Sequence, residues 1–262
     1  MTGRDVTAKL APVLQQLELE QLRVVTKAEL QSFADAARLT WPVEVIIRRL
    51  RESGWLLDLE TRGVWEFAPA ARAGAFGSGD PLIELRATLA RDSSAPFAVA
   101  AESAAYLLGL ATRRPELEVL GAPEGTRLPK ALRALRVVRW APVNDLLVKD
   151  GLPVWSSATL IAFMASRPSG YRDWPNVGEW ITQAAREVAV ETIGKELQGR
   201  SRAAWARAAY LVDRGGLPEA GAQILALAPP GAGPHYLGDR SVSGSYDGSY
   251  DVVDSTRMEV AE

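Results

Sequence analysis

The stretch "VEVIIRRLRESGWLLDLETRGVWEF", Val43 to Phe67, joins the pattern of a short helix to the pattern of a two-stranded ribbon. Within 41–53, apolar residues recur at helical spacing, so one face carries Val43, Ile46, Ile47 and Leu50. Gly54 follows as the helix stop, because glycine adopts left-handed backbone angles without steric cost. The stretch therefore predicts a helix and then a hairpin.

The hairpin is expected to turn through the three-residue loop 61–63, Thr-Arg-Gly. Such a loop favours glycine at its last, left-handed position. With this loop, Leu57 faces Phe67 and Asp58 faces Glu66. Apolar pairs then share one side of the ribbon and the acidic pair lies on the other.

Two further helices are predicted before this stretch. Residues 6–19 place apolar side chains on one helical face, namely Leu10, Val13, Leu14 and Leu17. Thr26 followed by Glu29 is a capping box. Thr40 is expected to cap the third helix, with Pro42 in its first turn. Three helices followed by a hairpin within about 70 residues is the order of a winged helix-turn-helix.

Composition excludes several classes of protein. The chain has 262 residues, of which 47% are hydrophobic and 24% charged, as in a globular protein of one large or two modest domains. It has no cysteine, so disulfides, thiolate metal sites and cysteine nucleophiles are excluded. Its one histidine, His235, lies in a segment that resembles a loop, which excludes a histidine-rich metal site.

Targeting and catalytic motifs are not evident either. The start of the chain does not resemble a signal peptide, and no stretch approaches the roughly 20 apolar residues of a membrane helix. We therefore expect a cytoplasmic protein without membrane contact. "FGSGD" has no following lysine, so it is not a phosphate-binding loop. No pair of carboxylates has a spacing that indicates acid/base chemistry, and we expect no catalytic activity, no cofactor and no metal. The sequence leaves open a metal site made only of carboxylates.

A segment rich in Ala, Gly and Pro, "APAARAGAFGSGDP" at 68–81, predicts a boundary between domains. We assign residues 1–70 to a winged helix-turn-helix domain, 71–81 to a linker and 82–262 to a second domain. The predicted fold class is α+β, with a larger, helix-rich mixed α/β second domain. Its helices are predicted at 82–92, 98–111, 156–166, 177–198, 200–214 and 217–226. Its strands are predicted within 117–123, 135–142 and 152–156.

The tail from 239 to 262 contains a small repeat, GSYDGSYD. It predicts either a flexible loop or a turn before a final strand at Tyr250–Val253.

The polar face of the predicted helix 41–53 suits DNA. In a helix-turn-helix the N-terminal half of the third helix enters the major groove. We expect four residues to face base edges there: Trp41, Glu44, Val45 and Arg48. Arg49, Arg51 and Lys27 are better placed for phosphates. Arg62, at the tip of the wing, is expected to contact the minor groove or the backbone.

A simpler interpretation remains open for the same residues. Charged residues on a helix usually face water, and winged helices also serve as protein-contact modules. Residues 1–69 hold nine Lys and Arg against ten Asp and Glu, whereas DNA-binding domains are more often basic. A net charge of -2 for the whole chain means that any DNA contact requires a local basic patch.

Several ordered segments resemble one family. "RLRESGWLLDLETRGVWEFAP" resembles the wing of the AbiEi-type antitoxins, transcriptional regulators of type IV toxin–antitoxin (abortive infection) systems. "DPLIELRATLA" and "PFAVAAESAAYLLGLA" are similar to the first helices of the family's antitoxin domain. "LPVWSSATLIAFMASRPSGYRDWPNVGEWI" and "LQGRSRAAWARAAYLVDRGGLPEAGAQIL" are similar to its later helices. The resemblance runs from about residue 10 to about residue 240 as a set of individually weak motifs. The chain departs from it at 104–106, Ala-Ala-Tyr, where a more polar helix start is typical.

The resemblance implies two roles. The N-terminal domain would bind inverted repeats in double-stranded DNA upstream of its own operon, as an autoregulating repressor. The C-terminal domain would counter a cognate nucleotidyltransferase toxin, directly or indirectly. The alternative is a winged-helix transcriptional regulator whose second domain senses a ligand or mediates assembly, with no toxin partner. An enzyme with a winged-helix appendage is a more remote third hypothesis.

Two basic segments of the second domain are further candidates. Five bases follow one another between Glu124 and Asp145 with no acid among them. We predict that they form a basic strip that contacts DNA or the toxin: Arg127, Lys130, Arg133, Arg136 and Arg139. The alternative is a solvated face balanced by acids elsewhere. Arg200 and Arg202, near a predicted helix start, are not placed to favour the helix dipole, so toxin contact is possible for them.

Overall fold

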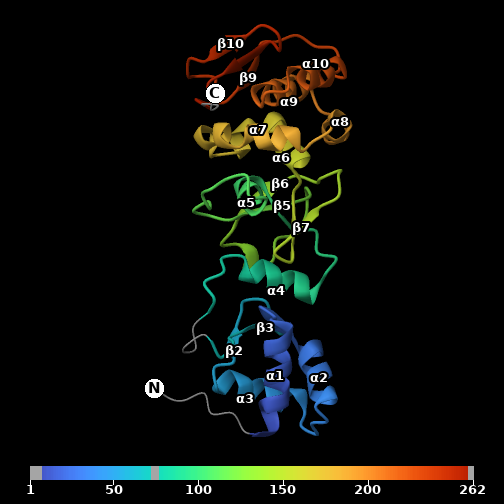
Figure 1. Ribbon diagram of the computed structural model, residues 1–262, viewed down its shortest axis with the longest axis vertical. Coiled ribbons are helices and arrows are strands. Elements are labelled where there is room, and N and C mark those ends of the chain that lie inside the picture. The colour runs from blue at the N-terminus through green and yellow to red at the C-terminus, as the bar shows by residue number, and fades with distance from the viewer. Residues whose placement is uncertain (1–7, 72–76, 259–262) are drawn as a thin grey trace. The chain divides into compact units, whose positions relative to one another are not determined.

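The computed structural model describes residues 8–71 and 77–258, and the chain divides into two compact units (Figure 1). The first unit comprises Met1–Ala95 and Arg127–Ala134, and the second comprises Pro96–Thr126 and Leu135–Glu262. The chain therefore passes between the units three times. The mixture of helices with separate small sheets makes the fold class α+β.

The first unit is built from helices around a three-stranded sheet of order β1-β3-β2. Its elements are η1 (Ala8–Leu10), α1 (Ala11–Glu20), β1 (Val24–Thr26), α2 (Lys27–Ala36), α3 (Val43–Glu52), β2 (Leu56–Asp58), β3 (Val64–Phe67), α4 (Ile83–Arg91) and η2 (Lys130–Leu132). Both strand pairs are antiparallel. The strand β1 was not predicted from sequence.

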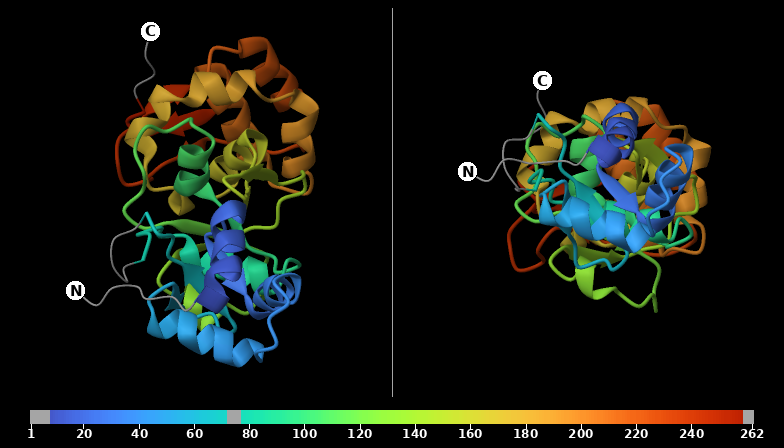
Figure 2. Two further views of the ribbon diagram at one scale, coloured as in Figure 1. Left: turned by 60° about the horizontal axis from the view of Figure 1, so that its bottom comes forward. Right: turned by 90° about the horizontal axis from the view of Figure 1, so that it is seen from below.

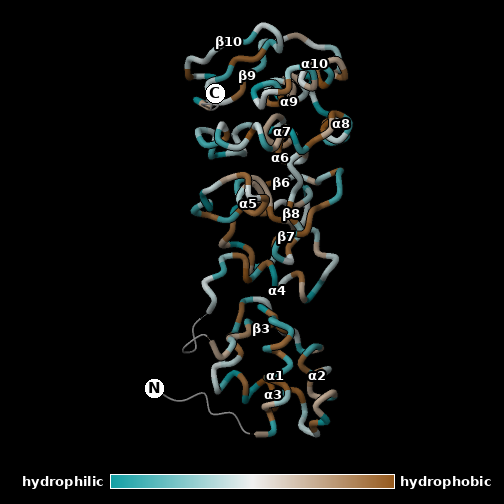
Figure 3. Tube along the Cα trace, viewed as in Figure 1, coloured by the Kyte–Doolittle hydropathy of each residue, from teal (hydrophilic) through white to brown (hydrophobic). Residues whose placement is uncertain are grey.

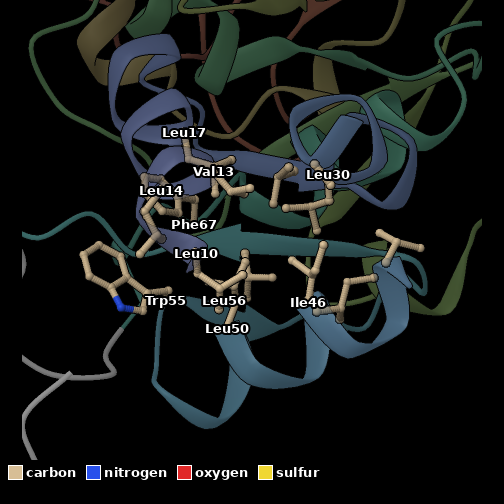
Figure 4. Packing of buried hydrophobic residues seen from close by; sticks show 14 residues of the cluster. Leu10, Val13, Leu14, Leu17, Leu30, Ile46, Leu50, Trp55, Leu56 and Phe67 are labelled. Carbon is tan, nitrogen blue, oxygen red and sulfur yellow. The ribbon is translucent and has the colours of Figure 1, made fainter. Parts of the chain in front are cut away.

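One face each of α1, α2 and α3 contributes to a single core (Figure 4). The predicted apolar face of α3 is buried: Val43, Ile46, Ile47 and Leu50. At roughly 25 cal/mol per Å² of apolar surface, each such side chain contributes on the order of 2 kcal/mol before entropy is counted. The helical periodicity of the sequence thus identified the inward face correctly.

The helix ends were only partly predicted. The capping box at α2 is confirmed: the Glu29 N–H donates to Thr26 Oγ1 at 3.2 Å, and the Thr26 N–H donates to Glu29 Oε2 at 2.7 Å. Gly54 has φ +73°, as a residue after a helix end requires. Thr40 is not the cap of α3, because the helix begins at Val43 with Pro42 at the cap position and no side-chain cap bond.

The register of the hairpin differs from the prediction by one residue. Leu56, not Leu57, pairs with Phe67, and Leu57 pairs with Glu66. Leu56 pairs with Phe67 because this register buries both side chains fully in the core. Glu66 lies on the opposite side of the ribbon, where its carboxylate accepts the N–H of Ser78. A single-residue shift reverses which side chains face the core, so here packing overrode the turn pattern.

The helix α4 belongs to the first unit, whereas the sequence placed it after the linker in the second domain. It contacts β1 and β3. A nearly buried ion pair fixes its start, with Arg86 Nε 2.7 Å from Asp80 Oδ2. Residues 72–76 of the predicted linker 71–81 lie outside the described residues.

The second unit contains a five-stranded mixed sheet of order β6-β5-β4-β8-β7 and a three-stranded sheet of order β10-β11-β9. Its strands are β4 (Ala98–Val99), β5 (Val119–Ala122), β6 (Arg136–Arg139), β7 (Leu147–Lys149), β8 (Leu152–Val154), β9 (His235–Leu237), β10 (Ser245–Asp247) and β11 (Val252–Asp254). Its helices are α5 (Ala101–Leu107), α6 (Ser157–Ser166), η3 (Pro168–Gly170), η4 (Trp174–Glu179), α7 (Ile181–Arg186), α8 (Val190–Leu197), α9 (Arg202–Arg214) and α10 (Pro218–Ala226).

Several predicted elements of this unit were too long. The predicted helix 98–111 starts as β4, and α5 begins only at Ala101. The predicted helix 177–198 is broken into η4, α7 and α8, which lets α7 pack on α9 while α8 packs on α6 and α10. His235 is not in a loop but is buried in β9. The tail forms a turn before a final strand, which lies at Val252–Asp254.

The core of the second unit is packed closely around aromatic rings. The helix α6 has nine consecutive buried residues, from Ser157 to Ala165. The hydrophobic residues of β5 and β8 are among those drawn brown in Figure 3. Trp155 is fully buried across Gly121, where an added Cβ would lie 2.5 Å from the indole ring. Within the described residues, no helix is both long and apolar enough to cross a membrane.

Candidate nucleic-acid interface

The exposed face of α3 carries the charges that the sequence analysis singled out. Figure 2 shows α3 in light blue at a margin of the first unit. Glu44, Arg48 and Arg49 are exposed and Val45 is half-buried. Lys27, at the start of α2, forms an exposed ion pair with Glu44, Nζ to Oε1 2.6 Å. The hydrogen bond from Lys27 lowers the pKa of Glu44.

The other α3 arginines also have partners. Arg48 Nε lies 4.0 Å from Glu52 Oε1, and Arg51 pairs with Asp58 of β2. Exposed pairs of this kind stabilise a protein by about 0–1 kcal/mol, so a phosphate can replace the carboxylate at little cost. The ion pairs therefore position the arginine side chains on the surface and still allow them to change partner.

Trp41 lies before α3 and not on it. Its ring is partly buried against the core of the first unit, and the Arg49 guanidinium carbon lies 4.6 Å from the ring centroid. The aromatic ring therefore has a packing role and supports Arg49. Of the four residues predicted to face bases, the structure places Glu44 and Val45 in the first turn of α3 and Arg48 at its middle.

The loop between β2 and β3 is fixed by Glu84 in the first turn of α4. Glu84 Oε1 accepts the N–H of Glu60 at 2.6 Å. Glu84 Oε2 accepts the N–H and the hydroxyl of Thr61, at 3.1 and 2.8 Å. Thr61 is buried, whereas the next residue, Arg62, is exposed. The carboxylate thus holds the loop in the shape that presents Arg62. Local spacing in the sequence does not indicate this role for Glu84, because its partners lie more than 20 positions away.

A basic cavity of about 520 Å³ opens beside this loop. It is bordered by the loop residues 60–62, by α4 and by the segment 127–133 of the first unit. Five of its lining residues are bases: Arg62, Arg91, Arg127, Lys130 and Arg133. Its one acid, Glu60, is 2.9 Å from Lys130 Nζ, and this hydrogen bond lowers the pKa of Glu60. The cavity is therefore cationic and suits an anion such as a phosphate.

The predicted basic strip is divided between the two units. Arg127, Lys130 and Arg133 join Arg62 at the cavity in the first unit. Arg136 and Arg139 lie in β6 of the second unit, as the sequence predicted for a strand, but their side chains turn to internal partners. Arg136 pairs with buried Glu102 and donates to the Gly170 carbonyl at 2.9 Å. Arg139 donates to the Thr126 carbonyl at 2.9 Å.

Arg200 and Arg202 are likewise engaged inside the second unit. The Arg200 guanidinium carbon stacks 3.9 Å from the Trp140 ring centroid. Arg202 Nη1 donates to the Pro229 carbonyl at 3.1 Å. Both side chains are half-buried. The structure therefore gives them packing roles, and the contact with a toxin predicted for them stays a prediction.

A second cavity, of about 400 Å³, lies in the second unit next to Glu102 and Arg136. Its lining carries both signs of charge, and two of its arginines form ion pairs, Arg136 with Glu102 and Arg114 with Glu118. Burial raises the pKa of Asp173 on its rim. Among the described residues, no group of three or more His, Asp or Glu is placed to hold a metal ion. This mixed lining does not define a substrate.

Comparisons with known proteins agree with this architecture. Residues 97–214 match the family model described as AbiEi antitoxin C-terminal domain, which confirms the resemblance to AbiEi-type antitoxins for that part of the chain. The crystal structure of the RV2827C protein from Mycobacterium tuberculosis is similar, with a TM-score of 0.79 and 29% sequence identity. The similarity covers 97% of this chain and 94% of that chain. No curated protein matches the chain.

Proposed function

We propose, from the AbiEi antitoxin domain at 97–214, that the chain is the antitoxin of a type IV toxin–antitoxin system. In this proposal the first unit is a winged helix-turn-helix that binds inverted repeats in its own promoter and represses the operon. The second unit counters a cognate nucleotidyltransferase toxin. The family match supports the antitoxin role, and the cationic cavity beside the 60–63 loop supports the DNA contact.

The arrangement of the first unit suits a duplex. The start of α3 presents Glu44, Val45 and Arg48, which reach base edges when the helix lies in the major groove. Arg62 and the cavity bases then meet phosphates on either side of the loop. The bases from 127–133 compensate for the acidic balance of residues 1–69, since that segment adds three bases and no acid.

DNA binding is tested with the full chain and a duplex of its own promoter, by fluorescence anisotropy across a salt series. Each base that contacts a phosphate contributes roughly 0.9 to the slope of log affinity against log salt. We expect Arg127→Ala combined with Arg133→Ala to lower the slope by about 2 on the promoter and on unrelated DNA. Arg48→Ala should instead weaken promoter binding more than binding to unrelated DNA, by about 1–3 kcal/mol.

The matched control is Arg186→Ala, an exposed arginine on α7 of the second unit. It should leave the slope unchanged. If the cavity variants behave like this control, the first unit does not contact DNA through this surface. Full-length chain that binds neither duplex would remove the repressor role.

Toxin neutralisation is tested by co-expressing the full chain with the nucleotidyltransferase encoded next to it. Growth should be restored by wild-type chain and by the Arg127/Arg133 variant, because the proposal assigns these two bases to DNA. Loss of rescue in this variant would instead assign them to the toxin. A chain that binds its promoter and does not restore growth would favour the regulator without a toxin partner.

A further inference from the structure

An exposed apolar segment lies at one edge of the five-stranded sheet in the second unit. Leu147 and Val148 belong to the edge strand β7, and Leu146 precedes it. Their exposed fractions are 39% for Leu146, 41% for Leu147 and 75% for Val148. Exposed apolar edge strands are rare in monomers, because unpaired backbone groups beside apolar side chains attract another strand.

The hairpin geometry tells which backbone groups of β7 are free. The strands β7 and β8 pair with Lys149 opposite Leu152, and the turn residues Asp150 and Gly151 have φ +51° and +72°. A two-residue turn of this type makes its flanking pair, Lys149 and Leu152, hydrogen-bonded. The next pair, Val148 with Pro153, is then not hydrogen-bonded. The N–H and C=O of Val148 therefore point to the open edge, where no other strand of the described residues pairs with β7.

A buried carboxylate holds the chain that leads into this edge. Glu196 of α8 is 1% exposed, and its Oε1 accepts the N–H groups of Val143 and Asn144 at 3.1 and 3.0 Å. The same oxygen accepts the side chains of Asn144 and Thr159, at 3.0 and 2.7 Å. The edge is thus anchored before any partner arrives, which reduces the entropy lost on binding.

The charges along the segment complement those of a second copy. The sequence from 145 to 149 is Asp-Leu-Leu-Val-Lys. In an antiparallel pair centred on Leu147, Asp145 lies opposite Lys149 of the other copy, twice across the twofold axis. Leu146 then lies opposite Val148 in a hydrogen-bonded pair that uses the outward backbone groups of Val148. Charge, apolar pairing and hydrogen bonding therefore agree on one register.

We propose that two copies of this chain associate through β7, joining their five-stranded sheets across an antiparallel β7–β7 pair centred on Leu147. The partner is a second copy, because an unrelated strand would not match acid to base at both ends. The proposal is independent of the proposed function, since it concerns the second unit and is measured without DNA or toxin.

A cysteine scan tests the register directly, because the natural chain has no cysteine. Leu147→Cys puts its two thiols opposite each other in a non-hydrogen-bonded pair, within the reach of a disulfide. Val148→Cys places them roughly 8 Å apart between Cα atoms, beyond that reach. In a thiol–disulfide buffer we expect the Leu147→Cys dimer to exceed the Val148→Cys dimer at least tenfold. Random collision would give the opposite order, because Val148 is the more exposed residue.

Sedimentation equilibrium of the full chain provides the second measurement. Asp145→Lys and Lys149→Asp should each weaken association roughly tenfold, because two attractive cross-strand pairs become repulsive. The double variant Asp145→Lys/Lys149→Asp should regain wild-type association. A wild-type chain that stays monomeric at high concentration, equal cross-linking of the two cysteine variants, or a double variant as weak as the single ones would each overturn the proposal.

Discussion

Replacing Glu84 should loosen the 60–63 loop without unfolding the first unit. The Glu84 carboxylate accepts three hydrogen bonds from Glu60 and Thr61, one on Oε1 and two on Oε2. A hydrogen bond to a charged group stabilises by about 1.5–3 kcal/mol, and a neutral one by about 1 kcal/mol. Glu84→Ala removes all three, but Glu84 is only partly buried and water can solvate the freed donors, so we expect loop opening to become easier by about 3 kcal/mol, less than the sum of the three bonds.

Glu84→Gln separates the two oxygens. A glutamine oxygen in the Oε2 position keeps both Thr61 bonds, and the amide nitrogen then faces the N–H of Glu60, leaving that donor without its acceptor. We expect a cost of about 1–2 kcal/mol at Glu60 and a smaller cost at Thr61, whose two bonds remain but lose their charged acceptor. Because 1.4 kcal/mol is a factor of ten, amide exchange at Glu60 should quicken roughly tenfold in the Gln variant. In the Ala variant, exchange at Glu60 and Thr61 should quicken roughly a hundredfold.

Amide hydrogen exchange by NMR measures both effects residue by residue. Glu219→Gln is the control, since Glu219 is an exposed first-turn glutamate of α10. It should change no rate in the first unit. Two results would refute the reasoning: Gln and Ala variants that exchange alike at Glu60 and Thr61, or acceleration spread evenly over α1, α2 and α3.

Three other outcomes follow from packing and protonation. Gly121→Ala should destabilise the second unit by about 1–3 kcal/mol in urea unfolding, because the new methyl would meet the Trp155 ring; a neutral result would mean that the ring moves freely. Asp80→Asn should destabilise the first unit by about 1.5–3 kcal/mol at neutral pH, because it removes the charged hydrogen bond between Asp80 and the nearly buried Arg86. Burial alone would raise the pKa of Asp80, but the hydrogen bond from Arg86 lowers it overall. The wild type should therefore lose this stabilisation only as pH falls below about 4. In a plot of stability against pH, Asp80→Asn should show a shallower loss of stability on the acid side. Burial, and then the charge of Asp213, raise the pKa of Tyr250 to about 12. Its contribution to folding stability should therefore be complete below about pH 10 and lost as pH rises through about 12. Tyr250→Phe should reduce this alkaline loss of stability in thermal melts, and an unchanged pH dependence would contradict the assignment.

Local patterns in the sequence predicted local structure well. The inward face of α3 and the Thr26–Glu29 capping box depend on residues three or four positions apart, so the information is contained in one helical turn. The hairpin register was wrong because it depends on where Leu56 and Glu66 find partners elsewhere in the unit. The break between α7 and α8 was missed for a similar reason, since contacts with α6, α9 and α10 decide it.

The sequence predicted the positions of single residues of the candidate site but not how they group together. Helical periodicity placed Arg48 and Arg49 outside, and turn chemistry placed Arg62 in the loop between the strands. The run of five bases was evident in the sequence, but nothing in it showed that Lys130 and Arg133 join Arg62, whereas Arg136 turns to Glu102. Such a division depends on long-range packing, which composition and spacing do not encode.

Residues 127–134 belong to the first unit, although the chain on both sides of them belongs to the second unit. This arrangement has a consequence for synthesis on the ribosome. The cavity beside the loop lacks three of its five bases until this segment has been translated, and by then β4, α5 and β5 of the second unit have already been synthesised. The first unit therefore cannot reach its final form as an autonomous nascent domain. A gene fragment that stops at the end of α4 would encode only two of the five bases that line the cavity, Arg62 and Arg91.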